Sequence, residues 1–428
     1  MSEEGSTPPP GRKAAVTVLG VYAFAWVLPT LVAGYALLTM FEFQVLPVPG
    51  FVPQAHEGIL RFVFDPWQKW DGQWFLRIAQ AGYFDDDGSA AFLPAYPWLV
   101  RAATKVFGGD ALVAACVVSW TAFAGALALL FDLFRADLGE DDSRLALVLL
   151  ITFPTAFFFH AAYTESLFLL AVAAAFAAAR KDLWLLAGAA ALVATLTRWT
   201  GFALVPALAV EAWTRAAHDG SREKGSSWQR LLSKDGLRSL VRLSPVGLLS
   251  AALPALALPI VLAVLDHAIA DPWGFNRAQR LWERHLAPPW TGLFDGIRVL
   301  LPGHAPYLEP LPGGFPRLAQ YGGGFLEAHA YNLVAALAGL WLAFVALRRV
   351  RPSYGTFALA GVVLPLMTPS RLQPLQSMPR FLVVLFPLFM VMAMKLRGRP
   401  LGTACVISAF ALIQGFFIAR FTLWFWVA

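Results

Sequence analysis

The sequence predicts an all-α polytopic membrane protein with about 11 transmembrane helices. Of its 428 residues, 58% are hydrophobic and only 14% are charged, whereas soluble domains carry about 25% charged residues. Apolar runs close to the ~20 residues needed to cross a bilayer recur along the chain, and Lys and Arg gather in alternate connections, as they do in cytoplasmic loops. The net charge of +6 therefore bears on orientation, and nucleic acid is not an expected partner.

The elements follow from these runs in order. The polar tail, residues 1–14, is expected to be disordered and cytoplasmic, and residues 15–428 are expected to form a single transmembrane domain. The first apolar run is too long for the apolar region of a signal peptide and is interpreted as a retained span. The predicted spans are residues 15–40, 110–134, 145–160, 164–179, 183–198, 200–213, 243–265, 330–347, 354–368, 381–394 and 401–419.

The loops between the spans set the orientation. Residues 41–91 hold seven acidic residues against three basic ones, which predicts an outer loop, and residues 266–329, rich in Trp, Pro and Gly, form the second outer loop. Residues 214–242 hold seven basic residues against three acidic ones and are predicted to be cytoplasmic. Residues 92–107 are short and contain two prolines and two basic residues, so they are expected to be half-embedded and are not counted as a crossing.

Asp71 lies at the centre of a stretch, residues 67–83, that is too polar to cross a bilayer. If this stretch is helical, the carboxylate shares one face with Trp74, Phe75 and Ile78, and the other face carries Gln73, Arg77 and Gln80. This pattern predicts an amphipathic helix lying flat in the membrane interface, with its Trp residues at the headgroup level. A plainer interpretation stays open, because Asp also favours the first turn of any helix.

Further polar residues fall on the side predicted for Asp71. His160, Tyr163 and Glu165 lie at the turn between the third and fourth spans, Arg198 ends the fifth span, and Arg371 and Arg380 flank the turn between the ninth and tenth. A charged group at membrane depth costs roughly 2.5–3.5 kcal/mol, so each is a candidate for function. Structural roles are equally open: Arg198 can extend to the headgroups, Glu165 can stabilise a helix N-terminus, and a lone His160 can be a core residue.

Other patterns exclude several kinds of site. Cys116 and Cys405 lie in apolar runs, so neither a disulfide framework nor a CxxC site is predicted. The acidic run 85–87 is typical of a solvated loop, and the sequence predicts no metal or other cofactor, although a divalent metal stays possible. The glycine run 322–324 lacks the following Lys-Ser or Lys-Thr of a phosphate-binding loop. A transporter is usually indicated by a pair of matching broken helices in the two halves of the chain, and the sequence shows no such pair.

Five short motifs occur in one order: WDGQWFLRIAQAGY (70–83), FLPAYPWLV (92–100), AAYTESLFLL (161–170), TRWTG (197–201) and SMPRFLVVLFP (377–387). Together they resemble the motifs of the PIG-V-type mannosyltransferases, that is, the GPI mannosyltransferase II family and its bacterial relatives within the GT-C class. The sequence departs from the family pattern in WDG for WDA, FLPAYP for FFPLYP, and Arg198-Trp199-Thr200-Gly201 for an Arg-Ser-Asn-Gly-like stretch.

The resemblance implies a GT-C-like fold and an enzyme that takes mannose from a polyprenyl-phosphate donor at the outer or lumenal membrane face. The family's acidic catalytic base maps onto Asp71. Cations would hold the leaving phosphate, and Arg198, Arg371 and Arg380 are the candidates. His160, Tyr163 and Glu165 are expected to shape the sugar or acceptor pocket, and Trp70 is grouped with them.

The expected partners are the lipid-linked sugar donor, a hydroxyl acceptor on a glycan, lipid or protein, and membrane lipids. An Ala- and Leu-rich composition favours a bacterial plasma membrane. Two other classes stay open: a lipid or solute transporter or flippase, in which Arg198 and Glu165 would line a pathway, and a non-catalytic subunit of a glycosylation complex.

Overall fold

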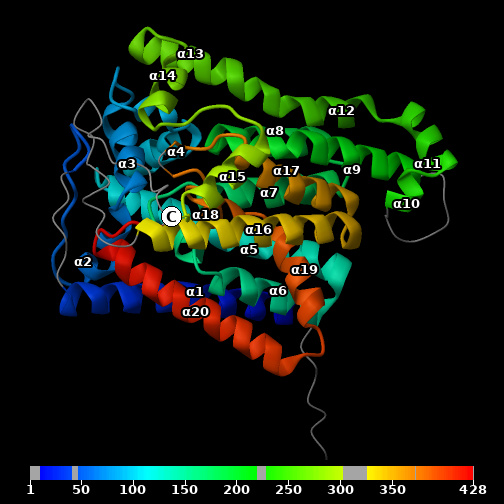
Figure 1. Cartoon of the computed structure of the whole chain (residues 1–428), viewed down its shortest axis with the longest axis horizontal. Helices are drawn as coiled ribbons and strands as arrows, with labels where there is room; N and C mark the ends of the chain where they lie inside the picture. The colour runs from blue at the N-terminus through cyan, green and yellow to red at the C-terminus, as the bar shows by residue number, and fades with distance from the viewer. Residues whose placement is uncertain (1–9, 41–46, 219–227, 302–324, 372, 428) are drawn as a thin grey trace, which may run out of the picture.

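A computed structural model of the chain describes residues 10–40, 47–218, 228–301, 325–371 and 373–427. Throughout these ranges the regular structure is helical, and no strand is formed; a single isolated bridge pairs Arg284 with Ser370. Most of the long helices run side by side across the view in Figure 1. The predicted all-helical architecture is confirmed for the described residues.

Five helical segments are long and apolar enough to cross a membrane, which makes the chain an integral membrane protein. Each coincides with a predicted span. They are α1 (Pro10–Thr39), α5 (Ala111–Leu138), α16 (Phe325–Arg349), α20 (Pro400–Thr422) and the segment built from α12 (Pro245–Ala252), η6 (Leu253–Leu256) and α13 (Ala257–Ile269).

Six shorter helices account for the remaining predicted spans. They are α6 (Glu140–Thr152), α7 (Glu165–Ala179), α8 (Trp184–Thr197), α9 (Leu204–His218), α17 (Pro352–Leu366) and α19 (Phe386–Leu396). None reaches the ~20 residues that cross a bilayer unaided. That each of them completes a crossing stays a prediction.

Three of the six predicted spans that these shorter helices represent are interrupted where proline or irregular backbone intervenes. Residues 145–160 divide at Pro154 into α6 and η3 (Ala156–Phe159), since proline supplies no N–H and disfavours helix in the residue before it. Residues 200–213 begin with η4 (Trp199–Ala203), and residues 381–394 divide into α18 (Met378–Val383) and α19. Of the short helices at these breaks, η4 and α18 line the cavity described below.

The core lies among α7, α17 and α19. Here Phe176 meets the rings of Tyr354, Phe357 and Phe386 edge-on at 5.0–5.6 Å, an arrangement favoured by the ring quadrupoles. Close helix contact depends on small residues, as is usual in membranes: a Cβ on Gly355 would lie 2.4 Å from the backbone of Leu347. The antiparallel helices α16 and α17 therefore approach until their backbones touch.

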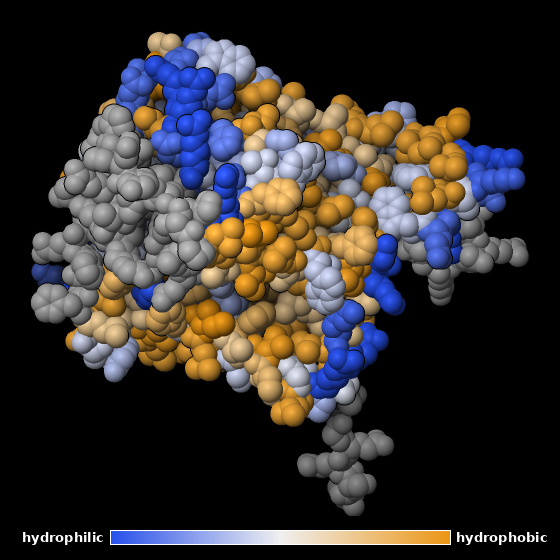
Figure 2. Space-filling view, viewed as in Figure 1, coloured by the Kyte–Doolittle hydropathy of each residue, from blue (hydrophilic) through white to orange (hydrophobic). Residues whose placement is uncertain are grey.

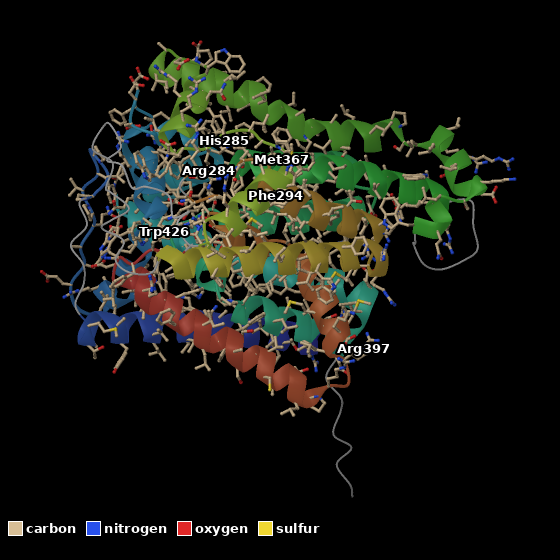
Figure 3. All side chains as sticks on the ribbon, in the orientation of Figure 1. Arg284, His285, Phe294, Met367, Arg397 and Trp426 are labelled. Atoms are coloured by element: carbon tan, nitrogen blue, oxygen red, sulfur yellow. The ribbon has the colours of Figure 1, made fainter. Side chains whose placement is uncertain are left out.

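The connecting segments gather at two opposite ends of the bundle (Figure 1). One end, called here the Asp71 end, holds α2 (Gly58–Phe64), η1 (Asp65–Gln68), α3 (Asp71–Ala81), η2 (Ser89–Ala91), α4 (Ala95–Thr104) and α14 (Gly274–Leu281). The other end holds α10 (Trp228–Leu231), α11 (Lys234–Arg238) and η5 (Ser239–Arg242). In Figure 3, Arg284 and Trp426 lie toward the Asp71 end, and Arg397 lies toward the other.

The described parts of the two predicted outer loops thus share one end, and the predicted cytoplasmic loop lies at the other. Figure 2 shows apolar side chains over the middle of the bundle and hydrophilic ones toward its ends. Which end faces the outside stays a prediction. Residues 302–324 of the second loop and 1–9 of the tail lie outside the described residues.

The predicted helix around Asp71 forms, and protein packs against it on more than one side. That it lies in the membrane interface stays a prediction. Both of its faces are covered by protein: Gln73 is 2% exposed and accepts a hydrogen bond from the backbone N of Val48 over 3.0 Å. Arg77 is 3% exposed and pairs with Asp87. The polar face is buried because loop residues on either side of α3 carry partners for it.

Candidate active site

Asp71 is the first residue of α3, and the backbone around it is tightly constrained. Trp70, just before it, has φ 54° and ψ −125°, which is uncommon for a bulky residue. A Cβ on Gly72, just after it, would lie 3.3 Å from both the Trp67 carbonyl oxygen and the Tyr163 ring. Gly72, which stands where the family motif has alanine, therefore lies where a side chain has little space. This packing fixes the direction of the Asp71 side chain.

A chain of charged side chains links three helices at this point. Arg380 of α18 donates from Nη1 to Asp71 Oδ2 over 2.8 Å and from Nε to Glu165 Oε1 over 3.0 Å. Glu165, the first residue of α7, also accepts a hydrogen bond from Arg198 Nη1 at 2.6 Å. Arg198 Nη1 lies 3.2 Å from the hydroxyl of Thr164 as well.

This chain is largely shielded from water. The Glu165 side chain is fully buried, and those of Arg380 and Arg198 are 7% and 10% exposed. The Arg380 guanidinium carbon lies 4.6 Å and 4.8 Å from the ring centres of Phe158 and Tyr163, within cation–π range. Buried charges are tolerated when they are paired, so the alternating signs explain how four of them can meet here.

A cavity of about 770 Å³ opens beside the charged chain. Asp71, Arg198 and Arg380 line it, together with side chains from η2, η4, α14, α17 and the turn before α18. Most of its apolar lining is formed by aromatic side chains and two leucines: Phe75, Phe92, Trp199, Phe202, Phe275, Trp282, Leu286, Leu364, Phe381 and Trp426. The cavity therefore combines one charged cluster with extensive apolar walls.

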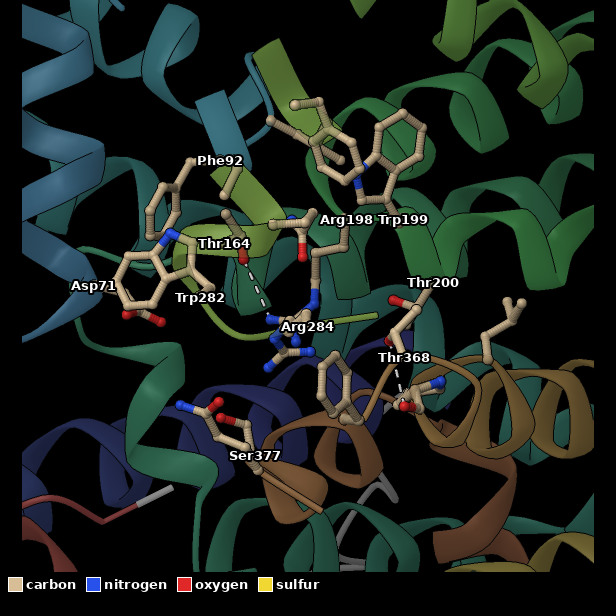
Figure 4. A pocket seen from close by; sticks show the side chains of 18 of the residues that line it. Asp71, Phe92, Thr164, Arg198, Trp199, Thr200, Trp282, Arg284, Thr368 and Ser377 are labelled. Carbon is tan, nitrogen blue, oxygen red and sulfur yellow. Dashed lines mark hydrogen bonds between the residues drawn. The ribbon is translucent and has the colours of Figure 1, made fainter. Parts of the chain in front are cut away.

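Arg284 is a further cation in this cavity and was not predicted from the sequence. In Figure 4 its guanidinium points into the middle of the cavity, with Asp71 on one side and Thr200 on the other. Among the described residues no carboxylate lies within ion-pair distance of it. Burial lowers the pKa of Arg284 to about 10; Asp71 opposes that shift, whereas Arg380 and Arg198 reinforce it. The side chain still carries its charge at neutral pH.

Backbone pairing explains how Arg284 reaches the cavity, which Arg280 of α14 also lines. The segment that carries it runs beside the turn after α17: His285 N donates to Pro369 O over 3.2 Å, and Arg371 N donates to Glu283 O over 3.0 Å. The predicted second outer loop contains several arginines, and nothing in their spacing separates them. The contact between two distant segments brings Arg284 into the cavity.

The remaining predicted site residues do not line the cavity. Tyr163 is buried beneath Arg380 and donates its hydroxyl hydrogen to Lys69 O over 3.0 Å. His160 is buried against the carbonyl of Ala25 in α1, and Trp70 packs edge-on against two Trp rings near the C-terminus. Arg371 is exposed, and its backbone makes the contact described above.

The acidic run 85–87 is engaged by arginines. Arg277 of α14 lies 2.6 Å from Asp85 and 3.5 Å from Asp86, while Asp87 faces Arg77. Within the described residues no group of three or more His, Cys, Asp or Glu side chains could hold a metal ion. These carboxylates join α14 to the loop after α3.

Solved structures with similar helix arrangements differ widely from this chain in sequence. The Archaeoglobus fulgidus oligosaccharyltransferase tethered to an acceptor peptide is 13% identical, with a TM-score of 0.40 over 94% of this chain and 55% of that one. ArnT from Cupriavidus metallidurans bound to undecaprenyl phosphate is 14% identical, with a TM-score of 0.32 over 87% and 77%. The chain spans about half the length of the oligosaccharyltransferase.

A search of curated protein sequences finds no match. A family model described as Mannosyltransferase (PIG-V), in contrast, matches residues 36–265. The matched region covers more than half of the chain and includes Asp71, Glu165 and Arg198, so the resemblance of the motifs is confirmed. The chain belongs to the PIG-V mannosyltransferase family.

Proposed function

We propose that the protein is an inverting glycosyltransferase that moves mannose from a polyprenyl-phosphate-mannose donor to a hydroxyl group of a glycan, lipid or protein at the outer membrane face. One observation carries the proposal: a carboxylate, Asp71, and four arginines meet in one cavity of an integral membrane protein, the arginines being Arg198, Arg280, Arg284 and Arg380. Family membership supports sugar transfer in general.

The charge of the site fits such a donor. Two carboxylates, Asp71 and Glu165, stand against four guanidinium groups, those of Arg198, Arg280, Arg284 and Arg380, which leaves two excess positive charges. A polyprenyl-phosphate sugar is a phosphodiester with one negative charge, so the excess positive charge favours its binding. Arg284 has no carboxylate partner within the described part of the chain, and in this proposal it binds the phosphate directly by charge-assisted hydrogen bonds.

Asp71 is suited to act as the general base. Its Oδ2 is held by Arg380, and its side chain is 21% exposed to the cavity, so Oδ1 is available to an acceptor hydroxyl. The acceptor oxygen attacks the anomeric carbon, the bond from that carbon to the phosphate oxygen breaks, and the hydroxyl proton passes to Asp71. A positioned base of this kind contributes typically 10²- to 10⁴-fold to the rate.

The leaving lipid phosphate takes the electron pair of the broken bond, and its charge is stabilised by preorganised cations. In this proposal the arginines supply that stabilisation, so a metal chelator should leave the rate unchanged. The apolar walls of the cavity, including Phe202, Leu364 and Phe381, provide a path for the donor's hydrocarbon tail toward the lipid.

The proposal is tested by incubating the purified protein with radiolabelled polyprenyl-phosphate mannose and candidate acceptors. Wild-type protein should form a mannosylated product, and Asp71→Asn should keep its fold and its donor binding while losing about 10²- to 10⁴-fold in turnover. Asp85→Asn, a change in the same part of the chain but outside the cavity, serves as the control. Near wild-type turnover of Asp71→Asn would reject the base assignment, and donor translocation without transfer would favour the transporter alternative.

A further inference from the structure

Glu165 is a buried carboxylate that supports the cavity without lining it. Its side chain is 0% exposed, and its Oε1 alone accepts hydrogen bonds from both Arg198 and Arg380. Oε2 has no hydrogen-bond partner among the described residues. As the first residue of α7, the carboxylate also gains from the positive end of the helix. Its charge is thus directed at two arginines and at nothing that a substrate could reach.

Each arginine is oriented by this shared oxygen. Because Arg380 gives its Nε to Glu165, the planar guanidinium turns Nη1 toward Asp71 Oδ2 at 2.8 Å. Because Arg198 gives Nη1 to Glu165, with Thr164 beside it, the rest of its guanidinium faces the cavity that Arg284 enters. Arg380 is therefore held against Asp71, the proposed base, and Arg198 is held beside the position proposed for the phosphate.

The charge of Glu165 also bears on the product. Transfer converts the phosphodiester of the donor into a phosphate monoester, whose second pKa near 6 gives it about −1.5 to −2 charges at pH 7. The charge of Glu165 lowers by one the net positive charge of the arginine cluster that would hold this product. Without that charge the arginines would bind the more negative product more tightly.

We infer that Glu165 is a positioning residue that holds Arg380 against the base and Arg198 beside the leaving phosphate, and that its negative charge promotes release of the lipid phosphate product. This inference rests on the proposed function. It departs from the sequence-based expectation, in which Glu165 shapes the sugar or acceptor pocket.

The decisive variant is Glu165→Gln, which keeps the shape of the side chain and removes the charge. The expected result is a kcat at least tenfold lower, a donor KM that does not rise, and inhibition by added polyprenyl phosphate that is about tenfold stronger. Glu165→Asp keeps the charge but is too short to reach both arginines. It should lose kcat while its inhibition by polyprenyl phosphate stays at the wild-type level.

Glu211→Gln is the matched control. Glu211 is also 0% exposed and is bound by Arg351 at 2.6 Å and by Ser353 at 2.5 Å, but it does not line or support the cavity. Its substitution should lower the thermal unfolding temperature and leave kcat, KM and product inhibition of the folded fraction unchanged.

Three results would overturn the inference. A raised donor KM with unchanged kcat in Glu165→Gln would make Glu165 a substrate ligand, and kinetics indistinguishable from those of Glu211→Gln would make it a structural residue. If the Gln variant does not fold, Glu165→Asp decides: wild-type kcat in that variant rejects positioning. Absence of any transfer by the wild-type protein would instead reject the proposed function itself.

Discussion

Arg380 donates a hydrogen bond to Asp71 across 309 positions of the chain. The contact joins α3, in the first part of the chain, to the short helix α18, in its last part. It holds one oxygen of the carboxylate and leaves the other toward the cavity. A base whose orientation is fixed before the substrate arrives needs little reorganisation during the reaction.

Replacing Arg380 by Lys should lower kcat/KM by about 10²-fold. A lysine keeps the charge, but its ammonium group lacks the rigid fork that bonds Glu165 and Asp71 together. Arg371→Lys is the control, because Arg371 is exposed and does not line the cavity. Steady-state kinetics on both purified variants checks this expectation, and equal losses in the two would contradict the assignment of Arg380.

Replacing Arg284 by Gln should weaken the binding of polyprenyl phosphate by about 10- to 100-fold, the value of a hydrogen bond to a charged group. Stability should not fall, because Arg284 has no ion-pair partner among the described residues to leave behind. The exposed Arg298 of α15 (Pro289–Arg298) offers a control, Arg298→Gln. Equilibrium binding of the lipid phosphate is the measurement, and unchanged affinity in Arg284→Gln would exclude Arg284 from the phosphate site.

Replacing Thr200 by Val should leave stability equal or raise it by about 1 kcal/mol, because the Thr200 hydroxyl is buried and has no hydrogen-bond partner among the described residues. Thr200 lines the cavity, so a substrate that bonds this hydroxyl would be bound several-fold more weakly by the variant. Thr195→Val is the control, since the Thr195 hydroxyl is buried and bonds the Ala191 carbonyl at 2.8 Å. Thermal unfolding and KM values separate the two effects; an unchanged KM in Thr200→Val would remove Thr200 from the binding site.

His56 should make stability depend on pH. Its ring nitrogens lie 2.5 Å from Asp65 and 2.7 Å from Asp110. Burial lowers the pKa of His56, but the hydrogen bonds and charges of the two carboxylates outweigh burial and raise it above its ordinary value. A raised pKa in the folded state means that the stabilisation is complete below the unfolded-state value, about 6.5, and is lost as the pH rises through the folded-state value.

The unfolding temperature of the wild-type protein should therefore fall as the pH is raised from about 6. His56→Gln should lack this component. The same slope in both proteins would show that another group is responsible.

The helices were largely predictable from the sequence because membrane spans are long apolar runs with basic residues between them. Counting spans also placed Asp71, Arg198 and Arg380 on one side, and the structure brings these three into one cavity. The same counting could not rank loop residues, whose positions depend on backbone contacts between distant segments. It therefore selected Arg371, which is exposed, and missed Arg284. Arg284 lies between Glu283 and His285, whose backbone groups bond to the turn after α17.

Periodicity predicted the two faces of α3 but not what covers them. An apolar face and a polar face indicate a boundary, but they do not say whether water or protein lies beyond it. Gln73 and Arg77 face protein because loop segments on both sides fold over them. For the same reason, the residue type alone made His160 a candidate for the site. In the structure it is buried and bonded to a carbonyl of α1.

The division of charges along the chain has a consequence for biogenesis. Asp71, Glu165 and Arg198 are synthesised first and together carry an excess negative charge, whereas Arg284 and Arg380 follow and reverse its sign. Until the ribosome has passed Arg380, Asp71 lacks the cation that pairs with it in the finished protein. The early helices must therefore await the late ones before they can close around these charges, and quality control in the membrane could recognise the unmatched carboxylate of an incomplete chain.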